Sequence, residues 1–241
     1  MRYPLVFFSV SIVVLPIVSN AVVAHTPARV STAVNVLNKQ ELRQQDHRDC
    51  VKRAAQQIFT GQKLADFDWE CMVPALAPMA HMWFCVQFHE ECEVHGIDFR
   101  RRNIALTRKR WNELDTVNRE VNRDIFPQPS KGGLPTEEWL VSPPTGNCNA
   151  YAVTKRHKLL VLGWPSRALL LAEVLTRSGQ QHLVLVVRMK DINFVLDNLN
   201  ESIWPIESAG YRWERIESPQ NPKFWLMASE ADQVRADIAR D

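Results

Sequence analysis

Cys148 lies at the start of an expected helix, a position at which a thiol can become reactive. Cys148 follows the turn at Gly146 and opens residues 150–162, which have the composition of a helix ended by Gly163 and Pro165. A sulfur there lies near the positive end of the helix dipole and near unpaired backbone N–H groups, so its thiolate is favoured. The position predicts a nucleophile. The alternative is an inert buried thiol, as most lone cysteines are.

An imidazole and a carboxylate follow Cys148 along the chain. His182 precedes the apolar run 183–187, and Asp197 ends the apolar run 194–196. A thiol, an imidazole and a carboxylate in one hydrogen-bonded line form a hydrolytic triad. We therefore expect the three side chains to meet. The alternatives are a core histidine and a turn aspartate.

Regular elements around these residues can bring them together. Residues 168–175, 181–189 and 193–196 are short and apolar with turn residues between them, which predicts consecutive antiparallel strands. Thr107 is a typical N-cap for a helix whose apolar residues recur at three and four positions. These residues, expected in the core, are Trp111, Leu114, Val117, Val121 and Ile125.

Two asparagines lie one turn apart on the helix that follows Thr107. For Asn118 and Asn122 we expect solvent exposure, with hydrogen bonds to a neighbouring loop as the alternative.

The N-terminus has the composition of a signal peptide, residues 1–24. A basic start is followed by the apolar stretch 5–18 and by small residues at Ser19, Ala21 and Ala24. We expect a periplasmic or secreted protein with no membrane span after cleavage; an uncleaved anchor is the alternative.

The rest of the chain is expected to divide into three parts. Residues 25–79 form an N-terminal extension, 80–230 the main domain and 231–241 a C-terminal tail. A net charge of +2 over 241 residues does not indicate a nucleic-acid or anionic-membrane partner.

Five cysteines in an exported chain leave one thiol over. Cys85 and Cys92 are close enough in sequence to close a small loop, and Cys50 can pair with Cys71, which leaves Cys148 free. Other connectivities satisfy the count equally well.

Zinc is an alternative for part of this set, because imidazole and thiolate are its preferred ligands. Five such residues lie within a short stretch: His81, Cys85, His89, Cys92 and His95. A Cys85–Cys92 disulfide would consume both thiolates, and we expect no metal.

Several motifs follow one another in a fixed order between residues 80 and 226. They are Phe84-Cys85 with Cys92, Trp139, Gly146-Asn147-Cys148-Asn149-Ala150-Tyr151-Ala152, Lys155-Arg156, Gly163-Trp164-Pro165, His182-Leu183-Val184-Leu185, Leu196-Asp197-Asn198-Leu199, Tyr211, Trp213 and Trp225. In this joint order and spacing the chain resembles the bacterial transglutaminase-like cysteine proteinases, exported enzymes of the papain-like and transglutaminase-like superfamily.

The resemblance implies an α+β fold in which the nucleophile helix packs on an antiparallel β-sheet. The N-terminal extension is expected to be helical because apolar residues upstream of the resemblance are spaced as one helical face, at Val51, Ala55, Ile58 and Phe59. The same resemblance implies that Cys148 is the nucleophile, His182 the base and Asp197 the group that orients the imidazole. The backbone N–H of Cys148 is then the natural oxyanion donor. Trp139 is expected to wall the substrate site, or alternatively to be a buried structural residue.

The resemblance also bears on calcium. Some members hold a calcium ion with acidic residues at places that Asn147, Asn149 and Ala150 occupy here. Amides and a methyl group lack the carboxylate charge that binds calcium, so we expect weak or absent binding and no cofactor.

We predict an exported cysteine peptidase that hydrolyses peptide bonds through a Cys148 acyl-enzyme. The expected substrate is a protein, exported or attached to the cell surface. The alternatives are acyl transfer to an amine, as in transglutaminases, and a non-catalytic binding domain with an idle triad.

Overall fold

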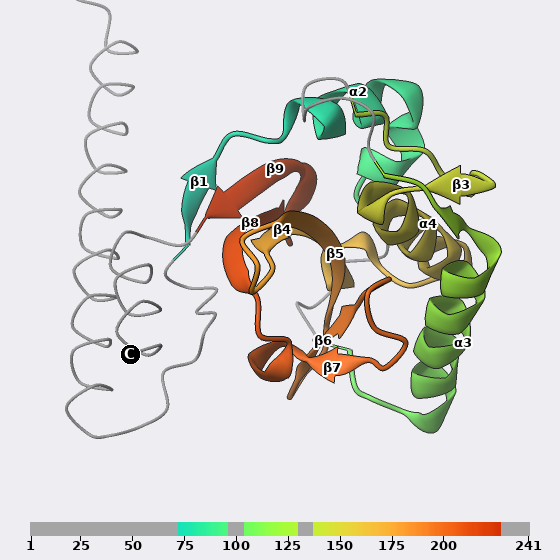
Figure 1. Cartoon of the computed structure of the whole chain (residues 1–241). Helices are drawn as coiled ribbons and strands as arrows, with labels where there is room; N and C mark the ends of the chain where they lie inside the picture. The colour runs from blue at the N-terminus through green and yellow to red at the C-terminus, as the bar shows by residue number, and fades with distance from the viewer. Residues whose placement is uncertain (1–71, 96–103, 130–136, 228–241) are drawn as a thin grey trace, which may run out of the picture. The chain divides into compact units, whose positions relative to one another are not determined.

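The computed structural model describes residues 72–95, 104–129 and 137–227 (Figure 1). All of them belong to one compact unit, Asp46–Asp241. The predicted signal peptide, the Cys50–Cys71 pair and the C-terminal tail lie outside the described residues. Within those residues, none of the helices has the length and apolar character needed to cross a membrane.

An antiparallel sheet of seven strands, in the order β1-β9-β8-β4-β5-β6-β7, forms the body of the domain. Its centre confirms the three predicted strands: β4 (Leu169–Leu175), β5 (Gln181–Arg188) and β6 (Asn193–Leu196). The remaining strands are β1 (Val73–Ala75), β7 (Trp204–Pro205), β8 (Arg212–Ser218) and β9 (Asn221–Met227). Since β1 pairs with β9, the sheet includes residues that precede the expected boundary at residue 80.

Three helices accompany the sheet: α2 (Met79–Gln87), α3 (Arg108–Asp124) and α4 (Cys148–Val161). The predicted cap of α3 is confirmed, because Thr107 Oγ1 accepts a hydrogen bond from the backbone N–H of Arg110 at 3.2 Å. Short 3-10 helices are η2 (His89–Cys92), η4 (Ser166–Ala168) and η5 (Ile206–Ser208). A parallel pair of two-residue strands, β2 (Phe126–Pro127) and β3 (Thr145–Gly146), leads into α4.

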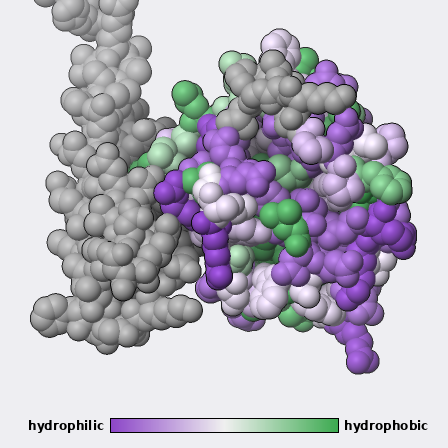
Figure 2. Space-filling model, in the orientation of Figure 1, coloured by the Kyte–Doolittle hydropathy of each residue, from purple (hydrophilic) through white to green (hydrophobic). Residues whose placement is uncertain are grey.

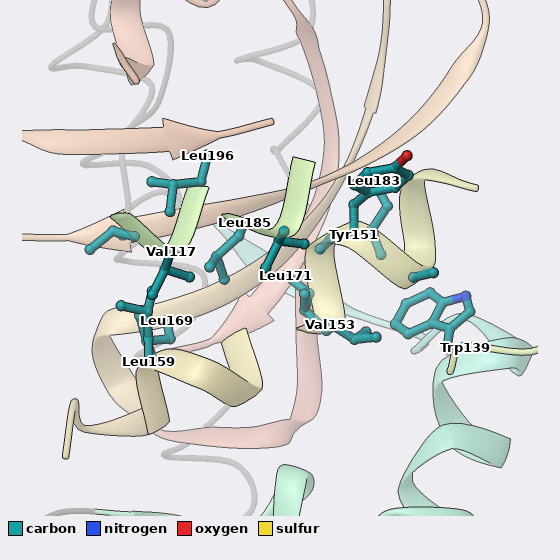
Figure 3. Close-up of a cluster of buried hydrophobic side chains, with 14 of the residues drawn as sticks. Val117, Trp139, Tyr151, Val153, Leu159, Leu169, Leu171, Leu183, Leu185 and Leu196 are labelled. Atoms are coloured by element: carbon teal, nitrogen blue, oxygen red, sulfur yellow. The ribbon is translucent and has the colours of Figure 1, made fainter. Parts of the chain in front are cut away.

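Both faces of the central strands are apolar. Leu169, Leu171 and Leu185 point toward α3 and α4, where Val117 and Leu159 meet them (Figure 3). The intervening residues, such as Leu170 and Val186 with Trp213 of β8, form a second cluster on the other face. Continuous apolar runs are expected for strands that are buried on both faces.

Two expectations for α3 were wrong. Trp111 is 37% exposed, although its ring contacts Phe194 edge-on, because it lies at the margin of the buried face. Asn118 is fully buried, and its amide donates to the backbone carbonyl of Glu201 at 2.8 Å. Asn122 likewise donates to the carbonyl of Asp197 at 3.0 Å. The alternative, hydrogen bonds to a neighbouring loop, therefore holds for both asparagines.

The surface seen in Figure 2 is mainly hydrophilic, with hydrophobic residues scattered over it. Scattered apolar residues are normal for a globular surface.

The structure contains the predicted disulfide between Cys85 and Cys92, and Cys148 is a free thiol. The buried His81 lies beside the disulfide, with Nε2 3.5 Å from Cys85 Sγ. Its Nδ1 accepts from Trp225 Nε1 at 3.2 Å, so Nε2 carries the proton and donates to Glu217 Oε1 at 3.1 Å. Both ring nitrogens are thus used within the protein.

Gly146 is required by a close approach between β3 and the start of α4. A Cβ at Gly146 would lie 2.4 Å from the Cβ of Ala150, a distance at which the backbone must shift. Since Cys148 lies between these two residues, the shift would move the thiol.

We predict that Gly146→Ala lowers the free energy of unfolding by about 1–3 kcal/mol, the usual cost of overpacking. Urea unfolding of the variant measures this loss. The double variant Gly146→Ala/Ala150→Gly removes the clash, so its loss should be smaller than the sum of the two single losses. Additive losses would contradict the close approach.

Candidate active site

Cys148 is the first residue of α4, two residues earlier than the expected helix start. Asn147 caps the helix, because its Oδ1 accepts a hydrogen bond from the backbone N–H of Asn149 at 3.1 Å. The Cys148 thiol is partly buried, and its Sγ lies 3.7 Å from Asn149 Oδ1. The sulfur therefore occupies the helix start, where N–H groups have no partners in the helix.

The pairing of β5 and β6 brings His182 and Asp197 to the same end of the two strands. Leu185 of β5 pairs with Leu196, the last residue of β6, and Asp197 follows Leu196 directly. His182 is the second residue of β5, so both residues lie at this end of the pair. The observed distance from His182 Nε2 to Asp197 Oδ1 is 2.7 Å.

The Asp197 carboxylate is buried, with 4% of the residue exposed, and both oxygens accept hydrogen bonds. Oδ1 accepts from His182 and from the backbone N–H of Leu199 at 3.0 Å, and Oδ2 accepts from the Tyr211 hydroxyl. Burial alone would raise the pKa of Asp197, but these donors outweigh it and lower the pKa below its ordinary value. Asp197 is therefore an anion at neutral pH.

Cys148 and His182 interact directly. Burial alone would lower the pKa of His182, but hydrogen bonds and charge interactions with Asp197 and with Cys148 raise it to about 9. Because Nε2 is bound to Asp197, the nitrogen left for the sulfur is Nδ1. The three predicted side chains thus lie near one another, and their roles as a catalytic triad stay a prediction.

The raised pKa links the His182 charge to stability. A folded-state pKa of about 9 exceeds the ordinary value of about 6.5, so folding favours the protonated imidazole. This contribution is fully present below about pH 6.5 and is lost as the pH rises through about 9.

One polar residue at the site, Glu137, was not singled out from the sequence, and a second, Asn122, was expected to be exposed. Glu137 Oε2 accepts from Asn149 Nδ2 at 2.6 Å, and Asn122 holds the Asp197 carbonyl. Glu137 carries no pattern that distinguishes it from the adjacent Glu138. Asn122 carried a signal in its spacing from Asn118, one turn away on α3, since paired amides on a core-facing helix are unusual.

Trp139 does not lie open to substrate. It is 3% exposed, and its ring packs against His81 at a centroid distance of 5.6 Å and against Phe84 at 6.0 Å. The structural alternative accounts for this position.

The sequence contains two candidate metal sites, one for zinc and one for calcium. His81, Cys85 and Cys92 have ligand atoms within 4.8 Å of one another, but both sulfurs are in the disulfide and leave no thiolate for zinc. At the calcium positions of the family motif, the Asn147 oxygen caps α4 and Ala150 offers no ligand atom. Since none of the three side chains is a carboxylate, weak or absent calcium binding stays a prediction.

The chain matches the family described as bacterial transglutaminase-like cysteine proteinase BTLCP over residues 72–233, more than half of its length. It belongs to this family. The protein is therefore a cysteine peptidase with an α+β fold of the papain-like and transglutaminase-like kind, as the sequence predicted.

Solved structures of LapG from Legionella pneumophila are among those similar to the chain. One is 20% identical, covers 53% of this chain and 74% of that one, and has a TM-score of 0.40. A calcium-bound form is 17% identical, covers 54% and 80%, and has a TM-score of 0.42. Among curated proteins, no match was found.

We predict that NMR titration finds the His182 imidazole protonated at pH 7, with a pKa near 9. Asp197→Asn removes the negative charge while keeping the shape, so the His182 pKa should fall to the ordinary value of about 6.5 or below. Tyr211→Phe, which leaves the carboxylate in place, should change it less. An Asp197→Asn variant with an unchanged His182 pKa would rule out this electrostatic account.

Proposed function

We propose that the protein hydrolyses peptide bonds through a Cys148 acyl-enzyme, with His182 as base and Asp197 as the group that orients the imidazole. The observation that carries this proposal is the 2.7 Å bond between His182 and Asp197, in a site where His182 also interacts with Cys148. The buried Asp197 carboxylate and the Cys148 sulfur both favour the protonated form of the imidazole between them.

The reaction follows from the protonation states. At neutral pH His182 already holds the proton that it has taken from the thiol, and the Cys148 thiolate attacks the carbonyl carbon of the scissile peptide bond. The backbone N–H of Cys148 stabilises the oxyanion that forms. When the C–N bond breaks, His182 donates its proton to the leaving amine. Water, deprotonated by His182, then attacks the thioester and releases the acid and the thiol.

The Asp197 carboxylate fixes which ring nitrogen faces the sulfur. With Nε2 bound to Oδ1, Nδ1 is directed to Cys148, and the ring cannot rotate without breaking this bond. The Tyr211 hydroxyl and the Leu199 N–H prevent the carboxylate from turning away. Each group in the line is therefore oriented by the next.

We further propose that the protein is exported, acts in the periplasm or outside the cell, and cleaves a protein attached to the cell surface or exported with it. Export is supported by the signal-peptide composition of residues 1–24. A disulfide between Cys85 and Cys92 agrees with an oxidising compartment.

We predict that Cys148→Ala and His182→Ala each lower kcat/KM for a protein substrate by roughly a thousandfold or more. Candidate substrates come from comparing the new N-termini of surface proteins in cells with wild-type and Cys148→Ala enzyme. His157→Ala, a half-buried histidine whose Nδ1 binds Glu91, is the matched control and should retain activity. Full activity of Cys148→Ala would contradict the proposal.

The same assay separates the alternatives. Added amine that appears in the product identifies acyl transfer, and a folded wild-type protein that cleaves nothing while binding surface proteins identifies a binding domain.

We predict that a calcium chelator leaves the rate of hydrolysis unchanged, because Asn147, Asn149 and Ala150 supply no carboxylate. Calorimetric titration with Ca²⁺ should show no binding to the native protein. The triple variant Asn147→Asp/Asn149→Glu/Ala150→Asp should gain binding. Loss of wild-type activity on chelation, restored by Ca²⁺, would contradict this prediction.

A further inference from the structure

A lysine lies fully buried on the nucleophile helix. Lys155 is 0% exposed, and its Nζ has no hydrogen-bond partner among the described residues. An ammonium group has three donors, and its burial without acceptors is costly. Burial lowers the pKa of Lys155 to about 7, against the attraction of Asp197, which raises it. Its position therefore needs a reason.

The neighbours on α4 show where Lys155 points. Tyr151, four residues earlier, donates its hydroxyl to the carbonyl of Ile125 at the end of α3. Lys158, three residues later, binds Glu120 of α3 at 3.1 Å. Residues spaced by three and four share one helix face. Lys155 thus faces α3 between Glu120 and Ile125, where Asn122 lies.

Buried acceptors without hydrogen-bond partners in the described part of the chain occur on α3 and in the loop that follows β6. Three buried amide oxygens have no partner among the described residues: Asn118 Oδ1, Asn122 Oδ1 and Asn198 Oδ1. The amide nitrogens of Asn118 and Asn122 hold the carbonyls of Glu201 and Asp197, the two ends of the loop that carries the triad carboxylate. Within the residues that the structure describes, the ammonium group of Lys155 therefore lacks acceptors, while three amide oxygens lack donors. Each of these three oxygens belongs to a residue that lies in the loop 197–201 or holds one of its ends.

We propose that Lys155 is a positioning residue for the triad, joined directly or through buried water to these amide oxygens, so that it fixes the Asp197 loop against the nucleophile helix. A buried water with three or so polar partners is an ordinary part of such a network. The attraction between the ammonium and the Asp197 carboxylate acts in the same direction. This inference rests on the proposed triad, and it adds to the triad a buried residue of the nucleophile helix.

The test measures the His182 pKa by NMR titration in the full chain with Lys155→Met, which keeps length and most volume but removes the ammonium. If Lys155 positions Asp197, the pKa falls from about 9 toward the ordinary value of about 6.5. Because the Lys155 pKa is about 7, little positive charge remains on Lys155 where His182 titrates near 9. Loss of the remaining charge would raise the His182 pKa, so only misplacement of Asp197 gives a fall. Lys158→Met, on the same helix face, should leave the pKa unchanged.

Further variants test the network. Asn122→Ala should lower the His182 pKa, and its combination with Lys155→Met should lower it little further, because both act through one loop. Lys155→Gln, which keeps an N–H donor, should give an intermediate pKa and replaces Lys155→Met if that variant does not fold. An unchanged or raised His182 pKa in a folded Lys155 variant overturns the inference.

These outcomes separate the inference from the proposed function, because the titration needs no substrate. A wild-type protein that cleaves no peptide, together with a lowered His182 pKa in Lys155→Met, overturns the function and keeps the inference. An active enzyme whose His182 pKa does not respond to Lys155→Met overturns the inference and keeps the proposed function.

Discussion

The buried Asp197 carboxylate is the group on which the rest of the site depends. It lies at the end of β6 with 4% exposure, where an unpaired charge would be strongly destabilising. Its oxygens accept hydrogen bonds from His182 of β5, from the Leu199 N–H in the loop after β6, and from Tyr211, which directly precedes β8. The geometry of the candidate site and the local fold are thus stabilised by the same hydrogen bonds.

This arrangement explains why a helix and a sheet are both needed. The register of β5 and β6 sets the distance between His182 and Asp197, while α4 delivers the sulfur from a separate layer. Asn147 and Gly146 determine where α4 begins, one through a cap and the other through its lack of a side chain. A change in where α4 begins, or in the register of β5 and β6, would separate Cys148 from the imidazole even with the core still folded.

The sequence predicted those parts in which burial follows chain periodicity. The runs in β4 and β5 and the thiol at the start of α4 are local patterns, so they were recognised. β8 was missed because the buried Glu217, which pairs with His81, interrupts its apolar pattern. Asn122 was misjudged as exposed, since its partner, the Asp197 carbonyl, is 75 residues away. Contacts across such distances have no local signal.

The most direct measurement is the rate at which iodoacetamide alkylates Cys148 as a function of pH. If His182 is an imidazolium beside the sulfur, the wild-type protein reacts much faster than His182→Ala at pH 6, and the difference narrows as the pH rises through about 9 and the imidazolium loses its proton. Equal rates for the two proteins across this pH range would contradict the account.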